Sequence, residues 1–154
     1  MMVDYIYISV WGIIYLCCLF IPNIIWTHHM PQGYSSQNES KLLLYFERIG
    51  EVLVSFFAVI QFQKVQYEIN GLIIASIVCM LIYEGYWIHY FCSQKTLQDF
   101  YQPFLKIPLP GAVLPVVAFV LLSIYQQHIL LFVAIIILAI GHIGIHYQHY
   151  RELS

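Results

Sequence analysis

The stretch Leu42–Phe57, LLLYFERIGEVLVSFF, decides the fold because it combines a membrane-like composition with three ionisable side chains. Most of its residues are aliphatic or aromatic, yet Glu47, Arg48 and Glu51 lie close together in its middle. An ionised group in hydrocarbon is costly unless it is paired or hydrated, so such groups face the interior of a helix bundle. The stretch therefore predicts a transmembrane helix that turns one polar face toward other helices.

The composition of the whole chain predicts the same class of protein. Of its 154 residues, 61% are hydrophobic and 9% are charged, whereas soluble domains carry about 25% charged residues. So little polar surface cannot cover a soluble core. The net charge of −2 gives no case for a nucleic-acid partner, and no Lys/Arg cluster predicts a polybasic lipid-binding patch. We therefore predict a multi-pass, all-α membrane protein surrounded by the lipid bilayer.

Five apolar segments are expected to form the transmembrane helices of one bundle. Four of the apolar runs approach or exceed the roughly 20 residues that cross a bilayer as a helix. Together the five segments make a single transmembrane domain over residues 1–154, with helices expected at 5–26, 41–62, 71–91, 108–125 and 129–149. Between the third and fourth helices, residues 93–104 (SQKTLQDFYQPF) are amphipathic and are expected to lie at the membrane interface.

The basic residues predict the orientation of the chain in the membrane. Five helices place the first loop, the third loop and the C-terminus on the same side. That side carries most of the basic residues in the loops and at the helix ends, namely Lys41, Lys95, Lys106 and Arg151. The other side carries Lys64. Because positive loops stay in the cytoplasm, the N-terminus is expected outside and the C-terminus in the cytoplasm.

The polar residues within the helices predict a cavity that opens to the cytoplasm. A helix rises about 1.5 Å per residue, which places Glu51 roughly 15 Å from Lys41 and near the middle of the bilayer. The other candidates fall in the cytoplasmic halves of the second, third and fifth helices. The candidate ligand-binding residues are Glu47, Arg48, Glu51, Glu84, Trp87, His142 and His146.

The charges of these residues predict what the cavity holds. Arg48 can neutralise one of the carboxylates of Glu47, Glu51 and Glu84. We therefore expect that Glu51 or Glu84 is protonated, or that the cavity binds a cation. Aromatic side chains, Trp87 among them, can offer π-faces to such a cation. In the alternative interpretation, Glu47, Arg48 and Glu51 form a structural network that fixes helix packing.

A metal site is a weaker alternative. His142 and His146 are four residues apart, which puts two potential ligands on one helix face. A carboxylate from Glu51 or Glu84 would complete a two-histidine, one-carboxylate site. No cysteine and no second histidine pair supports this interpretation, and no cofactor motif is present. We predict neither a metal nor a cofactor.

Three classes of function fit these observations. We favour binding or translocation of a proton or a small, cationic or amphiphilic ligand, because buried carboxylate is in excess. A membrane-embedded enzyme on a lipid-like substrate is the second class, with Glu51 or Glu84 as general acid and His142 or His146 as base. The expected five-helix bundle, with acidic and histidine side chains in a pocket in one half of the membrane, resembles the emopamil-binding and sigma-2 receptor group. The resemblance is one of architecture alone. The third is an accessory subunit that docks another membrane protein, and a homo-oligomer is also compatible.

Overall fold

The computed structural model describes residues 5–153, which are mostly helical. The two ends of the expected domain, residues 1–4 and 154, lie outside this range. The helices are α1 (Val10–Thr27), α2 (Lys41–Val59), α3 (Gly71–Phe91), α4 (Leu97–Tyr101), α5 (Pro110–Tyr125) and α6 (Ile129–Glu152). By length and composition, α1, α3 and α6 could each cross a membrane. These three apolar helices suggest a membrane location.

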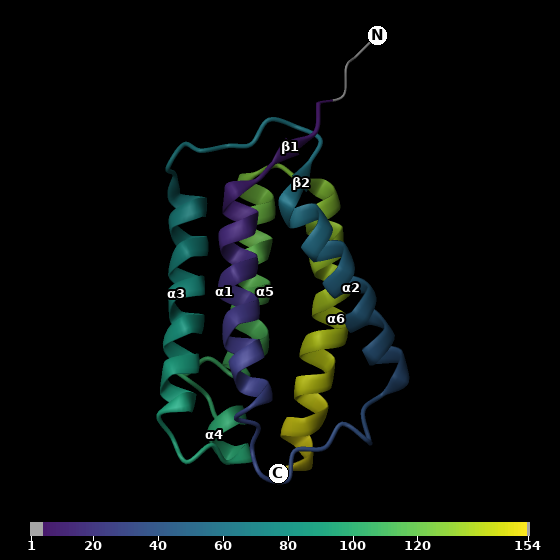
Figure 1. Cartoon of the computed structure of the whole chain (residues 1–154), viewed down its shortest axis with the longest axis vertical. Helices are drawn as coiled ribbons and strands as arrows, with labels where there is room; N and C mark the ends of the chain where they lie inside the picture. Colours follow the sequence, from purple (N-terminus) through teal and green to yellow (C-terminus); the bar gives the residue numbers. More distant parts are fainter. Residues whose placement is uncertain (1–4, 154) are drawn as a thin grey trace.

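The five long helices run side by side along the long axis of the molecule (Figure 1). α2 packs along α6, α3 packs along α5, and α5 and α6 join the two pairs. α1 contacts both α2 and α3. The short helix α4 lies at the end that carries the C-terminus, and the first and second strands lie at the opposite end (Figure 1).

The two short strands, β1 (Tyr7–Ile8) and β2 (Ile60–Gln61), correct the expected bounds of the first two helices. They pair antiparallel, so neither segment continues as helix. The Ser9 side chain instead caps α1 by accepting a hydrogen bond from the backbone N–H of Gly12 at 3.1 Å. The backbone N–H of Ser9 donates to the carbonyl of Val59 at 2.9 Å. The backbone groups of both segments are thereby paired with each other instead of within a helix.

The expected third helix is confirmed at both ends. Asn70 precedes its first residue and accepts hydrogen bonds from the backbone N–H groups of Leu72 and Ile73. α5 begins slightly later than expected, with Pro110 in its first turn, where a missing N–H costs nothing. α6 continues past its expected end as far as Glu152.

The segment between α3 and α5, which includes the expected interfacial stretch 93–104, closes one end of the bundle. Thr96 and Asp99 form a reciprocal capping box with two hydrogen bonds of 3.0 Å. The hydrogen bond from the Thr96 backbone lowers the pKa of Asp99, which therefore stays charged at neutral pH. Phe100 and Tyr101 are buried, and the Phe100 ring stacks on Trp26 at 5.3 Å.

Close packing of α2 on α6 depends on two glycines. A Cβ atom on Gly50 would overlap the backbone of Leu138. A Cβ atom on Gly141 would likewise overlap the backbone of Glu47. Because the backbones of the two helices nearly touch here, the side chains of Glu47 and His142 can meet directly.

Candidate functional site

A polar cavity of about 300 Å³ lies in the half of the bundle that carries α4. α1, α2, α3, α5, α6 and the loop between α1 and α2 all contribute to its wall. Its ionisable lining comprises Tyr34, Glu39, Glu47, Arg48, Glu51, His142 and His146. Trp87 also lines it, so the fold brings together every predicted ligand-binding residue except Glu84.

Glu47 of α2 and His142 of α6 form a partly buried polar pair that bridges two helices in this cavity. The His142 Nδ1 and Glu47 Oε1 atoms are 2.7 Å apart. The two side chains are 22% and 13% exposed, respectively. A short hydrogen bond in such a site is strong when one partner is charged. The pair can therefore hold a proton between an imidazole and a carboxylate.

Arg48 and Glu51 form a second, more open pair on α2. Their Nη1 and Oε2 atoms are 3.0 Å apart, and the side chains are 67% and 40% exposed. Pairs as accessible as this one contribute only about 0–1 kcal/mol. Arg48 therefore neutralises Glu51 but can release it to another cation at little cost.

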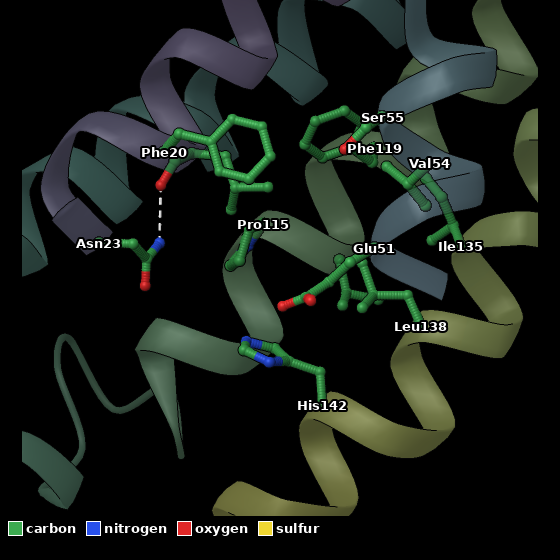
Figure 2. Close-up of a pocket in the computed structure, with 12 residues that line it drawn as sticks. Phe20, Asn23, Glu51, Val54, Ser55, Pro115, Phe119, Ile135, Leu138 and His142 are labelled. Carbon is green, nitrogen blue, oxygen red and sulfur yellow. Dashed lines mark hydrogen bonds between the residues drawn. The ribbon is translucent and has the colours of Figure 1, made fainter. Parts of the chain in front are cut away.

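A smaller, mostly apolar cavity of about 140 Å³ adjoins the polar cavity, and we call it the inner chamber. The two cavities share Asn23, Glu51 and His142. Most other residues around the inner chamber are apolar and include Leu19, Phe20, Val54, Phe119, Ile135 and Leu138. Figure 2 shows Glu51 and His142 reaching from α2 and α6 into one space beside Pro115. The inner chamber has the size of a cavity that accepts benzene, about 150 Å³.

The loop between α1 and α2 supplies ionisable groups that sequence reasoning missed. Glu39 Oε1 lies 3.0 Å from His149 Nε2 and accepts a hydrogen bond from the Tyr34 hydroxyl at 3.3 Å. Burial, aided by the charge of Glu39, raises the pKa of Tyr34 to about 12, so this hydroxyl keeps its proton. No periodicity marks a loop residue as part of a site. Glu39 reaches α6 only because the chain turns back in the loop between α1 and α2.

Aromatic rings line the polar cavity on the side opposite α2. Trp26, Trp87 and Phe100 all contribute to this lining. The ring of Phe100 lies 5.3 Å from that of Trp26 and 6.0 Å from that of Trp87, measured between centroids. A cation in the cavity would find π-faces as well as carboxylates within reach.

Glu84 does not line either of the two cavities. On α3 its neighbours Tyr83 and Trp87 are buried in the core, whereas Glu84 is only partly buried. Its Oε1 atom is buried and accepts no hydrogen bond from the described part of the chain. The fold therefore separates Glu84 from the other candidates.

The histidine pair on α6 does not build a metal centre with the carboxylates. The His142 and His146 rings are 4.6 Å apart between centroids. Within residues 5–153, no three His, Cys, Asp or Glu side chains are placed to hold a metal ion together. The carboxylate that bonds to His142 is Glu47, not the Glu51 or Glu84 that we had considered as a third ligand.

Comparison with protein-family models, with curated proteins and with solved structures finds no match for this chain. What the site can do follows from its own side chains. Three carboxylates face one guanidinium and two imidazoles around an aromatic-lined space. This charge pattern suits a positively charged ligand, and the Glu47–His142 hydrogen bond suits the transfer of a proton.

Proposed function

We propose that this integral membrane protein binds a small, cationic and amphiphilic ligand in the polar cavity and the inner chamber. The observation that carries the proposal is the meeting of the two cavities at Asn23, Glu51 and His142. At this junction a carboxylate-rich compartment adjoins an apolar one. A ligand with a positive head and a short apolar group matches both compartments at once.

In this proposal all five long helices cross the bilayer. α2 carries more charge than α1, α3 or α6, and Lys41 and Arg48 are exposed. Its other large exposed residues are apolar, namely Leu42, Tyr45, Ile49, Val52 and Phe56. Glu47 and Glu51 instead line the cavity. α5 has 16 residues and packs between α3 and α6, which shield much of it from lipid. The apolar residues on the outer surfaces of α2 and α5 support five membrane-spanning helices.

The cavity would open to the cytoplasm, with the N-terminus on the outer side. Lys41, Lys95, Lys106 and Arg151 belong to the end of the bundle that carries α4 and the C-terminus, whereas Lys64 belongs to the strand-bearing end. The positive-inside rule supports this orientation.

The head of the ligand would dock on Glu51. Arg48 is the partner that a cation must displace, and this accessible pair is weak. Removal of bulk water from the cavity strengthens the attraction between the head and the carboxylate. The apolar group would fill the inner chamber, where Val54 and Phe119 exclude water.

Substitution of Glu51 by Gln is expected to abolish stabilisation by a cation. We would use hexyltrimethylammonium as the probe and hexanesulfonate as its anionic control. A ligand at 100 times its Kd stabilises a protein by about 2.7 kcal/mol, which raises the melting temperature by roughly 5–10 °C for a chain of this size. The measurement is a thermal melt in mild detergent.

Glu68→Gln is the matched control, because Glu68 belongs to the loop at the opposite end of the bundle. The wild type and Glu68→Gln should gain the full shift with the cation and none with the sulfonate. Equal shifts with both probes, or an undiminished shift in Glu51→Gln, would exclude a specific cation site. If neither probe binds and a fixed partner protein copurifies, the accessory-subunit role replaces this proposal.

Acid–base catalysis on a lipid-like substrate is a second candidate function. The 2.7 Å contact between His142 and Glu47 favours it, because a carboxylate that orients an imidazole is a common arrangement for proton transfer. Mass spectrometry of molecules recovered from the cavity distinguishes catalysis from binding. A compound that the wild type alters chemically and His142→Gln leaves unaltered would establish an enzyme.

A further inference from the structure

We propose that the ligand is a single-chain cationic amphiphile taken from the lipid bilayer, and that its apolar chain enters the inner chamber between α1 and α2. The inference rests on the proposed function and names the class and the source of its ligand. We call the part of the chamber wall formed by Phe20 of α1 with Glu51 and Ser55 of α2 the side opening. A chain longer than the inner chamber extends through the side opening into lipid.

The exposure of the lining residues places the mouth of the inner chamber at α1 and α2. On α5 and α6, Phe119 and Ile135 are 2% and 0% exposed. Phe20 lines the same chamber, yet 42% of it is exposed, and the Glu51 side chain is 40% exposed. A residue that both lines a cavity and is exposed lies at its mouth. Figure 2 shows Phe20 and Ser55 reaching toward the chamber from these two helices.

The close contact between α1 and α2 lies at the strand-bearing end of the bundle. A Cβ atom on Gly12 of α1 would overlap the carbonyl group of Ala58 of α2. From this contact the two helices diverge toward the end that carries α4 (Figure 1). Phe20 and Glu51 lie about two helical turns beyond the contact on their own helices. The side opening is therefore in the part of the bundle where α1 and α2 separate.

The hydrogen bonds of α1 hold it to α3 and leave its contact with α2 apolar. The Tyr15 hydroxyl donates to the Ser76 hydroxyl at 2.9 Å, and the Asn23 side-chain amide donates to the Tyr83 hydroxyl at 2.9 Å. Within residues 5–153, no side-chain hydrogen bond or ion pair joins α1 to α2. An apolar chain that passes between these two helices therefore breaks no polar contact.

The charged head of the ligand has a separate, polar route to the same place. A charge is costly in hydrocarbon, so the head cannot follow the chain through lipid. The polar cavity shares Asn23 of α1 and Glu51 of α2 with the inner chamber, and it extends to Tyr34 and Glu39 in the loop. The head can thus approach Glu51 from the end that carries α4 while the chain moves in sideways. These two routes together fit a ligand that resides in the bilayer.

The volume of the inner chamber distinguishes a side opening from a closed chamber. At about 140 Å³ it compares with a cavity that accepts benzene, a molecule of six carbon atoms. A closed chamber of this size would reject chains much longer than hexyl. With a side opening, the remainder of a long chain stays in lipid. We therefore expect hexadecyltrimethylammonium to bind as well as hexyltrimethylammonium.

The measurement is a thermal melt of the full-length protein in phosphatidylcholine nanodiscs, with each probe expressed as its mole fraction in the bilayer. On this scale both cations should stabilise the wild type at similar mole fractions. Hexadecanesulfonate, the anionic control of equal chain length, should not stabilise it. Glu51→Gln should lose the stabilisation by both cations, because both heads dock on the same carboxylate.

The position of the side opening is tested by the ratio of the affinities for the two cations. Phe20→Trp places a bulkier ring against the passing chain, so it should weaken hexadecyltrimethylammonium roughly tenfold more than hexyltrimethylammonium. Phe20→Ala should move the ratio in the opposite direction. Ile21→Trp is the matched control, since this exposed neighbour on α1 lines neither cavity, and it should keep the wild-type ratio.

The outcomes separate the two proposals. Binding of hexyltrimethylammonium without hexadecyltrimethylammonium would overturn the side opening and leave the proposed function intact. So would an unchanged ratio in both Phe20 variants, or hexadecyltrimethylammonium binding that survives Glu51→Gln. Absence of binding of either cation to a folded wild type would overturn both proposals. The wild-type chain series alone tests the side opening, even if the Phe20 variants fold poorly.

Discussion

Gly141→Ala is expected to lower the free energy of unfolding by about 1–3 kcal/mol, the usual cost of overpacking a tight interface. The new Cβ would overlap the backbone of Glu47 and force α2 away from α6. Backbone cannot move aside as a flexible side chain can. The same displacement should separate Glu47 from His142 and weaken cation binding. Thermal melts in detergent with and without hexyltrimethylammonium measure both effects.

Gly144→Ala provides the matched control on the same helix. Its Cβ would meet only the end of the flexible Leu43 side chain. Alanine also favours helix over glycine by about 1 kcal/mol, so this variant should melt close to the wild type or above it. Gly71→Ala, whose Cβ has open space around it, should behave in the same way. Equal losses in Gly141→Ala and Gly144→Ala would contradict the described contact between α2 and α6.

Substitution of either member of the Glu47–His142 pair by Leu is expected to cost about 3 kcal/mol of stability, because it leaves the other member buried without its partner. The double variant Glu47→Leu/His142→Leu should lose much less, since an apolar pair of similar size replaces the polar one. A double-mutant cycle from denaturation curves gives the coupling energy directly.

The accessible pair on α2 serves as the comparison for this cycle. Arg48→Leu, Glu51→Leu and their combination should show coupling of at most about 1 kcal/mol, because solvent reaches both side chains. Additive losses at Glu47 and His142 would mean that these residues do not interact in solution. The proton-holding role of the pair would then have no basis.

The helices could be predicted from the sequence because their signals are local. A long, mostly apolar segment predicts α3 from Gly71 to Phe91, as observed. The predicted start of α1 and the predicted end of α2 were wrong because residues 7–8 pair with residues 60–61 as strands. Such pairing joins segments far apart in sequence, and no local pattern reveals it.

Local signals likewise predicted only part of the site. Helical spacing correctly placed Glu47 with Glu51, and His142 with His146, on cavity-facing sides of α2 and α6. Glu84 lies outside the two cavities, because the rotation of α3 follows the packing of large side chains such as Tyr83, Tyr86 and Tyr90, which are buried. Glu39 was missed because it comes from a loop, whose position depends on tertiary contacts with α6.

The most direct measurement is native mass spectrometry of the gently solubilised wild type beside Glu51→Gln and Glu68→Gln. All three should be folded, which their charge-state distributions report. We predict one small bound cation per chain in the wild type and in Glu68→Gln, and none in Glu51→Gln. An empty wild type, or equal occupancy in all three proteins, would contradict a cation site at Glu51.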